Sequence, residues 1–157
     1  MTDQNINIIA DFSLPTQNGE IVSVKDVVSQ NRFLVLYFYP KDNTSGCTKE
    51  TEDFSSLYTK FKGLDVEVMG ISRDSVKSHQ KFADKLEIPF ELFSDEEETV
   101  SVSFDVLKEK SMYGRKYMGI VRSTFVIDQS LAVIKEWRNV KVPGHAEEVY
   151  QYVESLR

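Results

Sequence analysis

The feature that most constrains the fold is a nearly continuous run of apolar and aromatic residues at positions 33–39, which ends at Pro40. Such a run is typical of a β-strand that is buried on both faces. A second apolar run follows at residues 66–71, and the segment between the two, residues 47–61, spaces its apolar residues at helical intervals. Strand, helix and strand in this order indicate an α/β architecture.

The rest of the chain completes this pattern. We expect an N-terminal β-hairpin at residues 11–24 and two further long helices at residues 75–86 and 144–156. A short helix is expected at residues 99–104, and two more adjacent strands are expected at residues 123–127 and 133–137. The segment between Gly114 and Gly119 is expected to be irregular, and the acidic residues 95–98 are expected to form a solvated turn. Together the elements predict a thioredoxin-like α/β fold, in which helices flank a central mixed β-sheet, as a single domain over residues 1–157.

The composition is that of a globular protein rather than a disordered chain, with 41% hydrophobic and 28% charged residues. The formal net charge of -6 disfavours nucleic acid and anionic membranes as partners, because both repel an acidic protein. No apolar run approaches the roughly 20 residues of a membrane-spanning helix. The polar N-terminus, residues 1–5, lacks the basic and apolar regions of a secretion signal. We therefore expect a cytoplasmic protein.

The chain has one cysteine, Cys47. A single thiol excludes an intrachain disulfide, a Cys-x-x-Cys pair and a zinc site made of cysteines. It can be an inert core residue, a reactive thiol, or a thiol that pairs with another molecule. Cys47 lies where a polar loop, residues 41–46, enters a helix, and the free N–H groups of a first helical turn favour the nucleophilic thiolate. Because a polar loop is a poor wall for an apolar pocket, the position favours a reactive thiol.

The residues around this cysteine resemble a known family. The motif Pro40-x-x-x-Thr44-x-x-Cys47 resembles the peroxidatic signature of the peroxiredoxins, and its surroundings resemble the bacterioferritin-comigratory (PrxQ-like) branch. Arg122, which precedes an apolar strand, is also part of this resemblance. Further likenesses follow in order along the chain, at residues 11–15, 70–75, 93–95 and 119–128.

The resemblance implies a role for five residues. Cys47 is the peroxidatic cysteine, Thr44 holds the peroxide with its hydroxyl, and Pro40 shields the thiolate. Arg122 supplies positive charge to the sulfur and the peroxide oxygens, and Glu50, one turn beyond the cysteine, orients the arginine. Simpler explanations stay open, namely a helix cap for Thr44, a solvated edge-strand charge for Arg122 and an ordinary first-turn acid for Glu50.

The chain differs from its branch in lacking a second cysteine. Many members carry a resolving cysteine five residues after the peroxidatic one, where this chain has Glu52, and others carry it on the following helix, near Ala83. The resemblance therefore implies a 1-Cys enzyme, whose oxidised Cys47 is resolved by an external thiol such as thioredoxin, glutaredoxin or glutathione. It also implies a monomer or a weak homodimer.

The sequence indicates no cofactor and no metal. It has no Gly-x-Gly-x-x-Gly and no phosphate-binding loop, and His79 and His145 lack metal-ligand spacing and are expected on the surface. The favoured function is a thiol-specific peroxidase that reduces hydrogen peroxide and organic hydroperoxides through a cysteine sulfenic acid. One alternative is a non-catalytic thioredoxin-fold binding, holdase or redox-sensor module, which would react slowly with peroxide. Another is a thiol-transfer enzyme, which the missing Cys-x-x-Cys disfavours.

Overall fold

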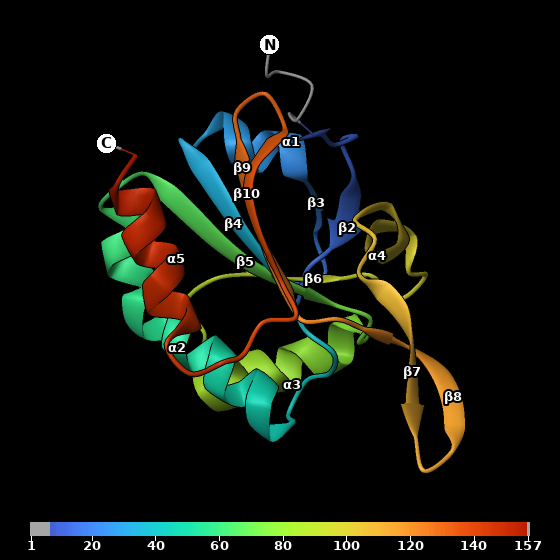
Figure 1. Cartoon of the computed structure of the whole chain (residues 1–157). Helices are drawn as coiled ribbons and strands as arrows, with labels where there is room; N and C mark the ends of the chain where they lie inside the picture. Colours follow the sequence, from blue (N-terminus) through green and yellow to red (C-terminus); the bar gives the residue numbers. More distant parts are fainter. Residues whose placement is uncertain (1–6, 157) are drawn as a thin grey trace.

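The computed structural model of the chain describes residues 7–156. Its elements follow in the order β1 (Asn7–Ile8), β2 (Ser13–Pro15), β3 (Ile21–Ser23), α1 (Val24–Ser29), β4 (Phe33–Phe38), α2 (Ser45–Lys62), β5 (Val66–Ser72), α3 (Val76–Leu86), β6 (Leu92–Ser94), α4 (Thr99–Ser103), β7 (Leu107–Met112), β8 (Arg115–Ile120), β9 (Ser123–Asp128), β10 (Ala132–Arg138) and α5 (His145–Glu154). Within these residues, a six-stranded sheet in the order β1-β10-β9-β4-β5-β6 forms the centre of the molecule (Figure 1). The pairs β2–β3 and β7–β8 form separate hairpins.

The central sheet is mixed, as the sequence predicts. β4, β5 and β6 run parallel to one another, and β9, β10 and β1 continue the sheet on the other side of β4 in antiparallel pairs. The register pairs Phe38, the last residue of β4, with Ser123, the first residue of β9. The loop that leads from β4 to Cys47 therefore starts beside the residue that follows Arg122.

The side chains of β4 alternate between two apolar cores, because successive residues of a strand point to opposite faces. Val35 and Tyr37 belong to a core with residues of α2, α3 and α5. Leu34 and Leu36 belong to a core with residues of α1 and α4. Figure 1 shows α2 and α5 packed side by side on one face of the sheet, with α1 and α4 on the other. The expected sandwich of helices around a sheet is confirmed.

The sequence pattern does not predict α1, which follows β3 directly. Ser23 ends the strand and caps the helix, because its Oγ accepts a hydrogen bond from the backbone N–H of Asp26 at 3.4 Å. The helix buries only Val24 and Val28, one turn apart. A helix this short contains too few turns for its periodicity to be read in the sequence.

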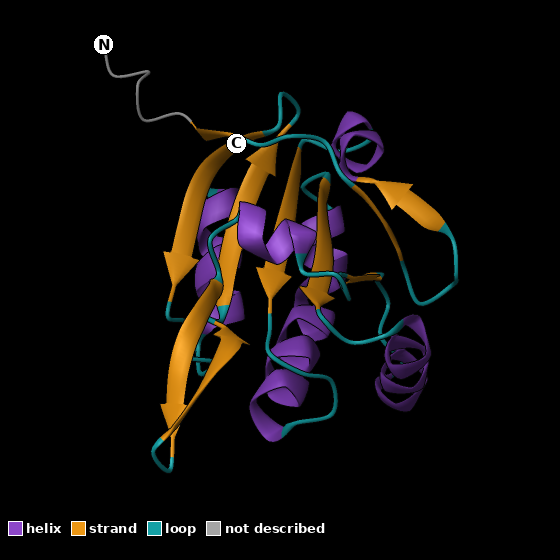
Figure 2. Cartoon of the chain, turned by 90° about the vertical axis from the view of Figure 1, so that its right-hand side faces the viewer, coloured by secondary structure: helices purple, strands orange, loops and turns teal. Residues whose placement is uncertain are grey.

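The expectation of an irregular segment between Gly114 and Gly119 is wrong. These residues form most of β8, which pairs with β7 in an antiparallel hairpin that extends away from the body of the protein (Figure 2). Tyr113 and Gly114 make the turn with φ values of 53° and 79°, as a two-residue hairpin turn requires. Both faces of this hairpin are largely exposed. The sequence therefore lacks the alternation of apolar and polar residues that a strand with one buried face shows, and by which a strand is predicted.

The expectation of a solvated turn at residues 95–98 is wrong for its first residue. Glu96 and Glu97 are exposed, but Asp95 is buried. The Asp95 carboxylate accepts hydrogen bonds from the backbone N–H and the hydroxyl of Ser101, at 2.8 and 2.7 Å. This acid therefore secures the start of α4.

Within residues 7–156, no helix combines the length and the apolar character needed to cross a bilayer. Residues 1–5, on which the expectation about secretion rests, lie outside the described residues.

Candidate active site

Cys47 lies in the first turn of α2, which begins at Ser45 after the N-cap residue Thr44. The backbone N–H groups of a first turn have no partner within the helix, and in a helix of 18 residues they form the positive end of a substantial dipole. Cys47 is only 1% exposed and shares a core with Tyr37 and Phe54. The thiol is therefore buried and at the same time next to electropositive backbone groups.

Arg122 joins Cys47 to Glu50. Its Nη2 donates to Cys47 Sγ at 3.4 Å, and its Nη1 donates to Glu50 Oε1 at 2.6 Å. Gly46 leaves room for this approach, because a Cβ at that position would lie 3.2 Å from Nη2 of the arginine. The structure thus brings together three of the five residues that the sequence singled out.

Burial governs the charge of this group. Glu50 is 1% exposed, and its Oε2 has no hydrogen-bond partner among residues 7–156. Burial raises the pKa of Glu50 to about 7, although Arg122 acts in the opposite direction. Burial lowers the pKa of Arg122, but Glu50 and Cys47 outweigh it, so the pKa of the arginine is raised. The guanidinium therefore stays charged next to the sulfur, while the carboxyl of Glu50 titrates near neutral pH.

Thr44 and Pro40 lie on the loop before α2. The Thr44 hydroxyl donates to the carbonyl oxygen of Lys41 at 2.8 Å and makes no capping bond to α2, so the explanation of Thr44 as a capping hydroxyl is wrong. Thr44 is exposed three residues before the cysteine, and Pro40 is half-buried just after β4. The structure shows no hydrogen bond from Thr44 to Cys47, Glu50 or Arg122.

His145 is buried at the start of α5, which corrects the expectation of a surface residue. Its Nε2 lies 2.7 Å from the hydroxyl of Thr124, two residues after Arg122, and its ring packs edge-on against Trp137 and Phe54. Burial lowers the pKa of His145 to about 4, and Arg122 adds to this effect. The imidazole is therefore neutral at neutral pH, and it lies close enough to Arg122 for the charge of the arginine to act on it.

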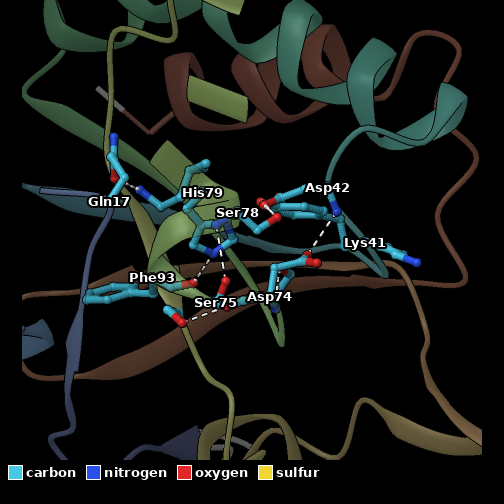
Figure 3. A network of polar contacts seen from close by, with 12 residues as sticks. Gln17, Lys41, Asp42, Asp74, Ser75, Ser78, His79 and Phe93 are labelled. Atoms are coloured by element: carbon cyan, nitrogen blue, oxygen red, sulfur yellow. Dashed lines mark hydrogen bonds and ion pairs between the residues drawn. The ribbon is translucent and has the colours of Figure 1, made fainter. Parts of the chain in front are cut away.

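His79 is also fully buried rather than on the surface, and Figure 3 shows the network around it. Its Nδ1 lies 2.7 Å from Asp42 Oδ2, and its Nε2 lies 2.9 Å from the carbonyl oxygen of Phe93. Asp42 also accepts from the hydroxyls of Tyr39 and Ser78, at 2.6 and 2.8 Å. The network fastens the loop between β4 and α2 to α3 and β6.

Asp42, Asp74 and His79 are the residues of this network that could hold a metal ion, since their ligand atoms lie within 4.8 Å of one another. Asp74 Oδ2 accepts from the backbone N–H of Asp42 at 2.8 Å and from the hydroxyl of Ser72 at 2.6 Å. Hydrogen bonds within the chain already engage the carboxylates and the imidazole. We therefore interpret the group as a structural network.

Sequence reasoning missed two contributors to the site, Gly46 and Asp42. Asp42 lies in the loop that carries the recognised motif and Gly46 lies in the first turn of α2 beside Cys47, so only their nearness to the motif could have drawn attention to them. Their contacts, however, are with Arg122 and His79, far away along the chain, and no pattern in the loop points to them.

Comparison with known proteins agrees with this geometry, since residues 7–136 match the AhpC/TSA family. The chain belongs to the AhpC/TSA family. It is 44% identical over 146 residues to Peroxiredoxin Bcp of Bacillus subtilis, covering 93% of this chain and 92% of that protein. It is 43% identical over 150 residues to Peroxiredoxin Bcp of Xanthomonas campestris, covering 95% and 94%.

Solved structures give the same family and fold. A cysteine-to-serine mutant of Xanthomonas campestris Peroxiredoxin Q superposes with a TM-score of 0.88 at 41% identity, covering 93% of this chain and 92% of that chain. The chain is thus a peroxiredoxin of the Bcp/PrxQ branch with a thioredoxin-like fold and a single cysteine. Peroxiredoxins are peroxidases that depend on a thiol reductant.

Proposed function

We propose that this peroxiredoxin reduces hydrogen peroxide and organic hydroperoxides with Cys47 as its redox centre. The Cys47 thiolate attacks the terminal peroxide oxygen, so that an S–O bond forms while the O–O bond breaks. The leaving oxygen takes a proton and departs as water or alcohol, and Cys47 becomes a sulfenic acid. The contact of 3.4 Å between Arg122 Nη2 and Cys47 Sγ, at the first turn of α2, supports this proposal most strongly.

Ionisation of the thiol alone does not make a fast peroxidase. A free thiol with a pKa of about 8.5 is only ~3% thiolate at pH 7, so full ionisation gains about 30-fold in rate. The larger share comes from holding the O–O bond in line with the sulfur and from stabilising the charge that develops on the leaving oxygen. The guanidinium of Arg122 and the free N–H groups of α2 are the groups that we assign to this stabilisation.

The other three residues act around this centre. We assign the Thr44 hydroxyl to holding the peroxide: its hydrogen is given to the Lys41 carbonyl, so its oxygen is free to accept the peroxide O–H. Pro40 shields the thiolate from the solvent side. Glu50 is a positioning residue, because it holds Nη1 of Arg122 while Nη2 faces the sulfur.

The oxidised cysteine needs a reductant from outside the chain, because Cys47 is the only cysteine. A first external thiol attacks the sulfenic acid, which releases water and leaves a mixed disulfide. A second thiol then breaks the mixed disulfide and restores Cys47. Thioredoxin, glutaredoxin and glutathione are the reductants that we propose, for a protein that acts as a monomer or a weak homodimer.

The test is the rate at which hydrogen peroxide oxidises the pre-reduced protein, followed by rapid quenching and titration of its single thiol. We expect a rate constant orders of magnitude above that of free cysteine, no measurable consumption of hydrogen peroxide by Cys47→Ser, and a rate about 100-fold lower in Arg122→Ala. Arg32→Ala is the matched control, because Arg32 is exposed and its guanidinium contacts the Leu156 carbonyl and the Phe33 ring, away from Cys47. A rate like that of free cysteine, unaffected by Arg122→Ala, would favour the sensor or binding module instead.

A further inference from the structure

Lys110 is a half-buried cation on β7 that the proposed mechanism does not use. Its ammonium donates to the carbonyl oxygen of Ile120 at 2.5 Å, at the base of the hairpin. The stem crosses Gly119, where a Cβ would lie only 2.9 Å from Lys110 Cδ. The glycine therefore allows the lysine to point along the hairpin toward the body of the protein rather than into solvent.

Lys110 is the middle one of three cations that follow β8 toward Cys47. Arg73 donates to the carbonyl oxygen of Met118 at 3.4 Å, and Lys110 donates to that of Ile120. Carbonyls two residues apart on a strand are separated by about 6.6 Å. Two residues beyond Ile120 stands Arg122, which contacts Cys47 Sγ. Arg122, Arg73 and Cys47 all lie close enough to Lys110 to act on its pKa, so the three cations form a group that reaches the sulfur.

Two of these cations have a carboxylate partner and the third does not. Arg73 pairs with Glu98 at 2.8 Å, and Arg122 pairs with Glu50 at 2.6 Å. Among residues 7–156, no carboxylate lies within ion-pair distance of Lys110. Burial lowers the pKa of Lys110, the neighbouring Arg122 and Arg73 lower it further, and Cys47 acts in the opposite direction. The ammonium has no carboxylate partner, and a carboxylate placed there would supply one.

The face of the hairpin that carries Lys110 also offers an aromatic wall. Lys110 pairs with Tyr117 across the hairpin, so both side chains lie on one face. The Tyr117 ring reaches the same glycine as the lysine, with its Cε2 3.1 Å from a Cβ at Gly119. A ring and an ammonium side by side suit a molecule that has both an apolar body and a negative charge.

We propose that Lys110 is a specificity-determining residue that binds the carboxylate of an organic hydroperoxide while the peroxide group of the same molecule reaches Cys47. This inference rests on the proposed peroxidase function and adds a substrate class to it. Arg122 and the first turn of α2 serve every peroxide, whereas Lys110 serves those that carry a negative charge.

The test compares two peroxides that differ only in charge, cumene hydroperoxide and its 4-carboxylate derivative. The measured quantity is the ratio of their rate constants for oxidation of the pre-reduced protein. We expect this ratio to fall about fivefold in Lys110→Gln, the effect of a partly exposed ion pair, and to fall in the unsubstituted protein as salt is raised. Lys116→Gln removes the same charge from the opposite face of the hairpin, where Lys116 pairs with Ser111, and should leave the ratio unchanged.

The ratio separates the possible failures. Because both peroxides meet the same sample, partial unfolding of a variant lowers both rates and cancels. Equal losses for the two peroxides in Lys110→Gln, or no loss for either, would overturn the carboxylate site. If Lys110→Gln slowed only the reduction of the oxidised protein by glutathione, an anionic thiol, the result would overturn the carboxylate site and indicate a binding site for the reductant instead. Slow oxidation of the unsubstituted protein by hydrogen peroxide would overturn the peroxidase function and this site with it.

Discussion

Glu50→Gln tests whether burial sets the ionisation of the carboxyl that holds Arg122. The ordinary pKa of this side chain is 4.5, and burial raises it to about 7 in the folded protein. Between these values the unfolded chain loses a proton that the folded chain keeps. The contribution of this proton to the free energy of unfolding is therefore complete below pH 4.5 and is lost as the pH rises through 7. Between pH 5 and pH 8 the loss is about 2 to 3 kcal/mol.

The assay is urea unfolding of both proteins at several pH values from 5 to 8. Glutamine does not titrate, so the free energy of unfolding of Glu50→Gln relative to the parent should rise by about 2 to 3 kcal/mol over this range. A constant offset is also expected, because the variant leaves Arg122 without its ion pair, but only the pH-dependent part tests the argument. Other titrating groups contribute equally to both proteins and cancel. A difference that is flat from pH 5 to pH 8, or that falls, would refute the reasoning.

Two further predictions concern stability. Gly70→Ala should lower the free energy of unfolding by about 1 to 3 kcal/mol in urea titrations, because its Cβ would lie 2.8 Å from the Tyr37 ring and 2.9 Å from Leu92; a neutral effect would show that the core has slack there. In the parent we expect the free energy of unfolding to fall by about 2 kcal/mol as the pH is lowered from 7 to 4.5, because the unfolded chain binds a proton at His145 that the folded imidazole, with its pKa of about 4, does not bind. His145→Gln should remove this loss. Parallel pH profiles of variant and parent would contradict this.

The sequence predicted those parts of the fold whose signal is local. The buried run of β4, the helical spacing of α2 and the motif that ends at Cys47 can all be read within a short window. The loop geometry that places Cys47 at a helix start follows from the same window. The pairing of Cys47 with Arg122 could be expected only from the resemblance, and it became a contact because β4 and β9 are neighbours in the sheet.

The burial of the two histidines could not be predicted from the sequence. His79 is buried because Asp42 and the Phe93 carbonyl satisfy both of its ring nitrogens, and His145 because Thr124 meets its Nε2. These partners are far from the histidines along the chain, so the sequence around each histidine carries no trace of them. The sequence alone therefore predicts a surface position for a lone histidine, where an unpartnered one belongs.

The burial of Cys47, with 1% of its surface exposed, leaves little of the residue open to a partner molecule. In the proposed reaction a peroxide needs to bring only one oxygen atom to the sulfur. A thiol on a peptide or a protein is far bulkier, so under the same proposal we expect the first turn of α2 to move before such a thiol can line up with the new S–O bond. We therefore expect recycling by a protein thiol to be slower than oxidation by peroxide. Under the proposed function, the buried position protects the sulfenic acid between the two steps.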